Sequence, residues 1–255
     1  MLDAVPAKLY VVHGSHPCAT VERALELKGI PYKTVELMPA MHAAHQRLRF
    51  GQRTVPGIKL EDGEKVVGSR AILQRLEELA PEPPLLPADP ELRARVQDAE
   101  RWGEQVFQPI ARRLVWLGMR RHPAAIVAFG EHSTLPVPDV MARLSAPMIS
   151  RVEGMLNDVS EGAVRADLEA LPGHLDRIDA YIADGVMGRQ DVNVADLQIA
   201  PTVRLMMTLG DARPLIDGRP AAQLATRLFP DWDGDVPAGV LPAPAARAPA
   251  AAPTA

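Results

Sequence analysis

A serine, a histidine and a cysteine lie close together near the start of the chain. The segment 14–18, with the sequence GSHPC, contains Ser15, His16 and Cys18. It follows a short apolar run and precedes an amphipathic one, so it falls where a strand passes into a helix. The first turn of a helix offers unpaired backbone N–H groups and a partial positive charge. This environment stabilises an oxyanion or a thiolate, so the segment is suited to sulfur chemistry.

The residue types alone leave more than one role open for each of these side chains. Ser15 fits a plain N-cap of the helix, because serine is a favoured cap. Cys18 fits either a small buried apolar group or a thiol whose pKa is lowered by the start of the helix. His16 is expected to face solvent, as loop histidines commonly do, although its position would also let it tune either neighbour.

The elements that must position these residues form an α/β domain over residues 7–80. Strand-like and helix-like patterns alternate along it, and Asp62-Gly63 marks a hairpin turn. Strands are predicted at 8–13, 32–37, 58–60 and 65–67, and helices at 18–28, 41–50 and 69–79. The order is therefore βαβαββα.

A proline-rich linker, 81–89, separates this domain from an all-helical domain over 90–230. The helical domain begins with a long amphipathic stripe that Pro109 is expected to kink. Further helices are predicted at 140–159, 163–183, 194–209 and 221–228. Residues 236–255 consist almost entirely of Ala, Pro and Gly and are predicted to be a disordered tail.

The composition excludes several classes of protein. The net charge of -4 and the absence of long Lys/Arg runs argue against a nucleic-acid binder. The single cysteine excludes an internal disulfide and a four-cysteine zinc site, and it suits a reducing cytoplasm. We expect a cytoplasmic protein with no membrane-spanning helix, since no signal-peptide pattern and no run of ~18 apolar residues occurs.

Two further motifs resemble those of the glutathione S-transferase superfamily, which joins a thioredoxin-like domain to a helical one. They are Thr54-Val55-Pro56-Gly57 and Gly68-Ser69-Arg70-Ala71-Ile72. The resemblance implies a cis bond before Pro56, which leaves the backbone of Val55 free to pair with the cysteinyl part of glutathione. It also implies that Ser69 opens a helix whose N–H groups bind the γ-glutamyl carboxylate. Arg70 would either help to hold an anion or be an ordinary surface residue.

Gly68 departs from the family pattern, which usually has Glu or Gln at this position. The missing side chain would hold the γ-glutamyl group. This departure weakens the assignment of glutathione without affecting the fold, and it leaves another thiol, such as mycothiol, open.

The same resemblance places Ser15 at the position of the family's catalytic residue. Its hydroxyl would donate a hydrogen bond to the sulfur of glutathione or another small thiol and favour the thiolate. The thiolate would then attack an apolar electrophile. The thiol is a co-substrate and no cofactor is tightly bound, and the family also implies a homodimer. The open alternatives are thiol-disulfide or peroxide reduction through Cys18, and a non-catalytic binding or scaffold protein.

Three other sets of residues carry weaker signals. His42 and His45 have a spacing that metal ligands use, but no third ligand stands out, so we expect surface histidines and no metal site. Phe107, Trp116 and Met119 would line an electrophile pocket or form ordinary core. The segment 193–196 resembles a capping box and is expected to be structural.

Overall fold

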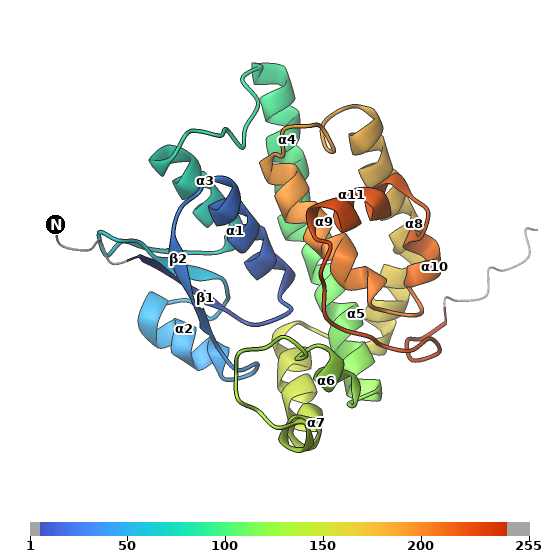
Figure 1. Cartoon of the computed structure of the whole chain (residues 1–255). Coiled ribbons are helices and arrows are strands. Elements are labelled where there is room, and N and C mark those ends of the chain that lie inside the picture. Colours follow the sequence, from blue (N-terminus) through green and yellow to red (C-terminus); the bar gives the residue numbers. More distant parts are fainter. Residues whose placement is uncertain (1–5, 244–255) are drawn as a thin grey trace, which may run out of the picture.

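The computed structural model describes residues 6–243, and a four-stranded sheet organises their N-terminal part (Figure 1). The strands are β1 (Ala7–Val11), β2 (Tyr32–Glu36), β3 (Gly57–Lys59) and β4 (Lys65–Val67), in the spatial order β2-β1-β3-β4. β1 pairs with β2 in parallel, and β3 pairs antiparallel with both β1 and β4. The predicted thioredoxin-like arrangement is confirmed.

Helices cover both faces of this sheet. They are α1 (His16–Leu27), α2 (His42–Phe50) and α3 (Ser69–Leu79). Successive side chains of a strand point to opposite faces. On one face Leu9 joins the core shared with α1 and α3, and on the other the ring of Tyr10 packs against His45 and Phe50 of α2. α1 and α3 therefore lie between the sheet and the helical half (Figure 1).

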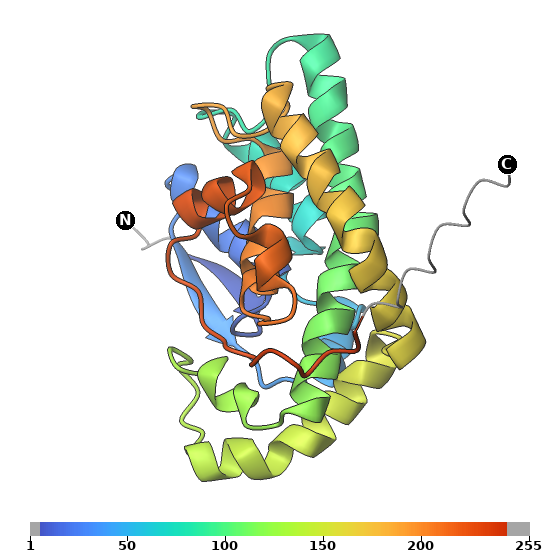
Figure 2. The same cartoon turned by 90° about the vertical axis from the view of Figure 1, so that its right-hand side faces the viewer.

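The helical half begins with a long rod of three consecutive elements (Figure 2). They are α4 (Pro90–Trp102), a π-helical turn, η1 (Gly103–Phe107), and α5 (Gln108–Arg121). Pro109 has no N–H to give to the preceding turn, and the wide π-helical turn directly before it accommodates that loss. A Cβ on Gly103 would lie 2.7 Å from Cγ1 of Ile199, so glycine is what lets the neighbouring helix approach the rod at this turn.

That neighbouring helix, α9 (Val194–Met207), is the centre of the helical half. Every residue along it except Arg204 and Met207 is buried, as expected for a helix that is surrounded by other elements. Its N-terminus has the predicted capping box, in which Asn193 and Asp196 each bond to the other's backbone N–H.

The remaining helices surround α9 and the rod (Figure 2). They are α6 (Ala125–Ala128), α7 (Asp139–Leu156), α8 (Glu161–Ala183), α10 (Arg213–Ile216) and α11 (Pro220–Leu228). The periodic sequence patterns found the three long ones. α6 and α10 were missed because four residues are too few to show a helical period. None of the helices in the described part of the chain is long and apolar enough to cross a bilayer.

The linker between the two halves is held by a buried lysine. The Nζ of Lys28, at the end of α1, donates to the carbonyl of Pro83 at 3.0 Å and to that of Ala80, and it lies 2.8 Å from Oε2 of Glu77. Glu77 also accepts the backbone N–H of Leu85. Charge-assisted bonds therefore fix a segment that has no regular secondary structure of its own.

Residues 236–243 correct the prediction of a disordered tail that starts at residue 236. Val236 is only 1% exposed and pairs with Leu209, and Leu241 is also buried. The carboxylate of Asp211 accepts the backbone N–H groups of residues 239–241. The composition of this segment does not reveal that Val236 and Leu241 are buried. It also does not reveal that a carboxylate elsewhere in the chain accepts the backbone N–H groups of the segment. Residues 244–255 of the predicted tail lie outside the described residues.

Candidate functional site

A cavity of about 360 Å³ lies between the two halves. The N-terminal half supplies the segment 12–17, the end of β2 and the residues just before Pro56. The helical half supplies one face of α5 together with parts of α6, α7 and the loop between them. Clefts between domains are where small-molecule sites usually form.

Ser15 lies on this cavity at the N-cap position of α1. Its backbone N–H donates to the carbonyl of Val12, and its own carbonyl accepts the N–H groups of Cys18 and Ala19. These bonds fix the backbone, yet the Ser15 hydroxyl makes no capping bond to the helix. The side chain is half-buried on the cavity side, and its polar neighbour is the thiol of Cys18. Because that thiol stays protonated and can donate to the Ser15 oxygen, the hydroxyl proton is available to a ligand.

Val55 is the second predicted site residue that lines the cavity. The Val55–Pro56 bond is cis, as the resemblance predicts. Within residues 6–243, the backbone N–H and C=O of Val55 make no hydrogen bond, whereas the carbonyl of Pro56 accepts the N–H of Gly68 at 2.9 Å. An extended peptide could therefore pair with the main chain of Val55.

The predicted carboxylate anchor, Ser69, begins α3 but does not line this cavity. It is 3% exposed, and its Oγ accepts a hydrogen bond from Nε2 of Gln198 at 3.0 Å. Gly68, just before it, has a φ of 92°, a conformation that favours glycine. The backbone conformation therefore explains why a glycine stands at this position. Arg70 is paired with Glu100 at 3.2 Å, and burial raises the pKa of that carboxyl to about 7.

The prediction for His16 was wrong. This residue was expected to face solvent, but it is 2% exposed, because it already belongs to α1 and its ring lies against α9. Its Nδ1 is 2.9 Å from Oγ1 of Thr202. Burial, helped by the charge of Arg112, holds the pKa of His16 well below its ordinary value, so the ring is neutral.

One face of α5 forms the wall of the cavity opposite Ser15. Arg112, Val115, Trp116 and Met119 follow the i, i+3, i+4, i+7 spacing of a single helix face, and all four line the cavity. Trp116 and Met119 thus have the pocket position that the sequence suggested. Phe107 does not, because it is fully buried and stacks on Trp102.

His42 and His45 are half-buried, and their side chains contact different residues. The Nδ1 of His42 lies 3.4 Å from Oε1 of Glu153 at the edge of the cavity, whereas the ring of His45 packs on Tyr10. Among residues 6–243, no group of three or more His, Cys, Asp or Glu side chains could hold a metal ion.

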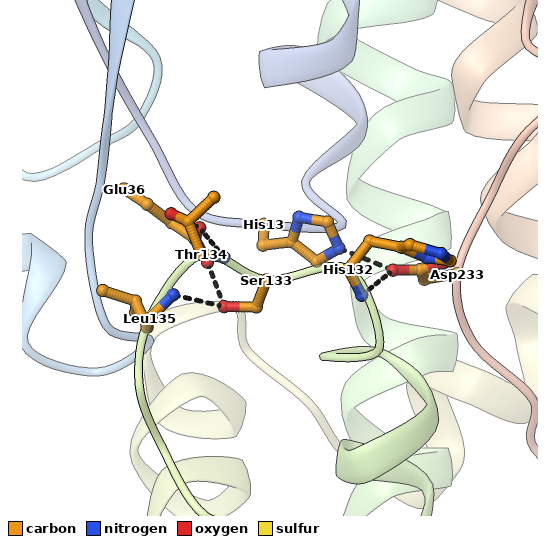
Figure 3. Close-up of polar contacts among 7 residues, drawn as sticks. All are labelled: His13, Glu36, His132, Ser133, Thr134, Leu135 and Asp233. Atoms are coloured by element: carbon orange, nitrogen blue, oxygen red, sulfur yellow. Dashed lines mark hydrogen bonds and ion pairs between the residues drawn. The ribbon is translucent and has the colours of Figure 1, made fainter.

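Two carboxylates tie the loop between α6 and α7 to the rest of the molecule (Figure 3). Glu36, at the end of β2, accepts hydrogen bonds from the hydroxyls of Ser133 and Thr134 and from the N–H of Thr134 at 2.7 Å. Asp233 lies 2.7 Å from ring nitrogens of both His13 and His132. We call this set the loop latch. It was missed because nothing in the sequence connects residues about 100 to 220 positions apart.

Comparison with known proteins agrees with this architecture. Residues 9–84 match the family model of the glutathione S-transferase N-terminal domain. The N-terminal domain is therefore of the glutathione S-transferase type. A curated relative, the maleylacetoacetate isomerase of Pseudomonas aeruginosa, is 36% identical over 93 residues, which is 34% of this chain and 44% of the relative. The match therefore spans less than half the length of that relative.

Solved structures share the fold along most of both chains. A beta-etherase from Sphingobium has a TM-score of 0.60 at 18% identity, covering 88% of this chain and 99% of its own. A maleylacetoacetate isomerase from Anaeromyxobacter dehalogenans, solved with glutathione bound in its active site, has a TM-score of 0.53 at 22% identity, covering 88% and 89%. The cavity wall of α5 thus belongs to a helical half that follows the glutathione S-transferase fold.

In this glutathione S-transferase domain, the thiol of Cys18 is expected to resist alkylation. Cys18 is 2% exposed, and burial raises its pKa to about 12, although the hydrogen bond with Ser15 acts in the opposite direction. At pH 8 the thiol is almost entirely protonated. Iodoacetamide at pH 8 should therefore leave the native protein unmodified by mass spectrometry and modify it fully in urea. Rapid alkylation of the native protein would contradict this expectation.

The loop latch is expected to make the stability of the protein depend on acid pH. Burial raises the pKa of both Glu36 and Asp233, but the hydrogen bonds they accept outweigh burial, so both values lie below normal. Their contribution is complete above the unfolded-state pKa values of about 4 and is lost as the pH falls through the lowered folded values. The thermal midpoint should therefore fall between about pH 5 and pH 2, and fall less in the double variant Glu36→Gln/Asp233→Asn.

Glu61→Gln is the matched control for the latch, because Glu61 is an exposed carboxylate outside it. This variant should follow the native pH profile. If the double variant loses as much stability in acid as the native protein, the latch carboxylates are not responsible.

Proposed function

We propose that the protein is an enzyme that binds glutathione or a related small thiol, ionises it at Ser15 and directs the thiolate at an electrophile in the cavity. One observation carries this proposal. The Ser15 hydroxyl, which makes no capping bond to α1, and the backbone of Val55, which is unpaired within residues 6–243, border one cavity in a glutathione S-transferase domain. These two groups are what a cysteine-containing peptide needs, namely a donor for its sulfur and a strand-like partner for its main chain.

The chemistry assigned to the site is nucleophilic substitution or addition by sulfur. The Ser15 hydroxyl donates a hydrogen bond to the sulfur, which lowers the pKa of the thiol and lets its proton pass to solvent. The thiolate gives an electron pair to the electrophilic carbon. Either a leaving group departs with its bonding pair, or the π electron pair of a double bond moves to the neighbouring atom, which then takes a proton from solvent. No covalent bond to the protein forms. The wall of α5 holds the apolar part of the electrophile and excludes water.

Glutathione is the thiol that the relatives support, since the Anaeromyxobacter isomerase holds it in its active site. Ser69 remains the proposed carboxylate anchor, through the N-terminal N–H groups of α3. Gly68 leaves no side chain to assist it, so mycothiol is kept as the rival thiol. We further propose a cytoplasmic homodimer, which light scattering on the purified protein would test.

Calorimetric titration with reduced glutathione tests the proposal most directly. We expect saturable binding at millimolar concentration or below, followed by conjugation of 1-chloro-2,4-dinitrobenzene above the rate in buffer. S-methylglutathione is the matched control, because it keeps the peptide but has no ionisable thiol and should bind without turnover. Absence of binding at millimolar glutathione would reject glutathione as the co-substrate, and a repeat with mycothiol would decide between another thiol and a non-catalytic protein.

Reduction of disulfides or peroxides through Cys18 is the weaker candidate. Such chemistry needs an accessible thiolate, and the buried thiol with its raised pKa is a poor source of one. Activity that survives Cys18→Ala would remove this candidate.

A further inference from the structure

The guanidinium of Arg112 has no hydrogen-bond or ion-pair partner among the described residues. Arg112 lines the cavity from α5 and is partly buried, and within residues 6–243 it makes no hydrogen bond or ion pair. Its neighbour Arg113 instead holds Asp167 through two bonds of 2.7 and 2.8 Å. Burial, and then the charge of Arg113, lower the pKa of Arg112, while the more distant carboxylate of Glu104, which makes no ion pair with it, acts in the opposite direction. Arginine remains protonated near neutral pH. A shielded guanidinium with unused donors is stabilised when an anion binds it.

A second polar group beside the same cavity is also unsatisfied. His16 lines the cavity, its side chain is buried, and its Nε2 has no hydrogen-bond partner among the described residues. The charge of Arg112 acts on this ring, which places the guanidinium near the residue that follows Ser15. A ligand that brought only apolar surface to this end of the cavity would leave both groups unsatisfied.

The carboxylates that line the cavity are already engaged. Glu36 belongs to the loop latch, and Glu153 accepts the N–H of Ala40 at 2.7 Å. Arg53 reaches the carbonyl of Leu156 at 3.4 Å. Much of the wall between them is apolar and is formed by Val115, Trp116, Met119, Ile126, Phe129 and Ile149. Among residues 6–243, the cavity lining therefore combines the unpaired guanidinium of Arg112 with a largely apolar surface.

We propose that the cavity takes an apolar electrophile that carries an anionic group, a carboxylate above all, and that Arg112 binds this group. The inference deepens the proposed function, on which it rests in treating the cavity as the co-substrate's site. Arg112 lies one helical turn from Trp116, so the apolar body of the ligand can pack on the indole while the anion meets the guanidinium. A planar guanidinium suits a carboxylate because it can donate two parallel hydrogen bonds.

Glutathione also carries carboxylates, so Arg112 has a rival partner. In the proposed function the γ-glutamyl carboxylate binds near Ser69, which does not line the cavity, so the glycine carboxylate is the possible competitor. The two assignments make different predictions: if Arg112 served glutathione, its loss would weaken the binding of glutathione itself.

A matched pair of small ligands tests the subsite without requiring glutathione or turnover. The probes are 2-naphthoate and 2-naphthamide, which have nearly the same shape and differ in charge. Their affinities are measured by calorimetry for the native protein and for Arg112→Gln, Arg112→Lys and Arg120→Gln. Arg120 is the matched control, because it is an exposed arginine on the same helix outside the cavity lining. Arg112→Lys keeps the charge and remains informative if the neutral variant folds poorly.

The native protein should bind the carboxylate about tenfold or more tightly than the amide, the size expected for a hydrogen bond to a charged group. Arg112→Gln should reduce this preference to about threefold or less. Arg112→Lys should keep part of it, and Arg120→Gln all of it. The proposal is overturned if the native protein shows no preference or binds neither probe at millimolar concentration. It is also overturned if the preference survives Arg112→Gln, or if that variant instead loses affinity for glutathione. A preserved carboxylate preference without glutathione binding would reject only the proposed function.

Discussion

Replacement of Ser15 by alanine is expected to lower kcat/KM for conjugation by about 10²- to 10³-fold, the usual effect of removing one donor from a developing or resident anion. The donor matters because the thiol must be ionised before it can attack, and a hydrogen bond to the sulfur stabilises the thiolate. Ultraviolet absorbance of the bound thiolate, followed against pH, should show a higher pKa for glutathione on the alanine variant than on the native protein.

The Ser15→Ala substitution is expected to change the thiol chemistry without destabilising the fold. The Ser15 hydroxyl caps no backbone N–H, so Ser15→Ala should unfold at nearly the native temperature. Cys18→Ala is the matched control, because it lies three residues away in the same turn and is expected to retain conjugation. A native pKa for bound glutathione in Ser15→Ala, or loss of conjugation in Cys18→Ala, would transfer the catalytic role away from Ser15.

Replacement of Lys28 by methionine is expected to lower the free energy of unfolding by about 3 kcal/mol. The side chain of Lys28 is fully buried, and methionine can fill its volume but cannot donate to the two linker carbonyls or neutralise Glu77. The carboxylate of Glu77, which is mostly buried, is then left without its cation. Urea unfolding followed by circular dichroism measures the change.

Lys33→Met is the control for this prediction, because Lys33 is exposed on β2 and has no bond to the linker. Its stability should remain within about 0.5 kcal/mol of the native value. If both lysine variants lose the same amount, the loss at Lys28 reflects a general effect of removing charge and not the linker contacts.

The fold was largely readable from the sequence because its signals are local. Alternating strand and helix patterns, the Asp62-Gly63 turn and the capping box at Asn193 depend on residues within a few positions of one another. The cis bond at Pro56 was predictable only through the family resemblance. The bounds of the predicted strands and helices in the first half lie within two residues of those in the structure.

The candidate site was only partly predictable because it depends on contacts between distant segments. Ser15 and Val55 were found because they lie in recognisable motifs. The burial of His16 involves Thr202, and whether Arg112 has an ion-pair partner depends on which side chains of distant elements reach it. The loop latch joins residues from four separate parts of the chain. None of these relations has a periodic pattern or a fixed spacing that a single sequence could reveal.

The packing of residues 236–243 has a consequence for how the protein is made. Val236 covers Leu209 and lies against Gly118 of α5, where an added Cβ would come within 3.2 Å of it. Chains emerge from the ribosome N-terminus first, and domains fold as units once enough of them is available. The thioredoxin-like half can therefore form while synthesis continues. The helical half, in contrast, leaves the side of α5 near Gly118 uncovered until the ribosome has translated more than 100 further residues.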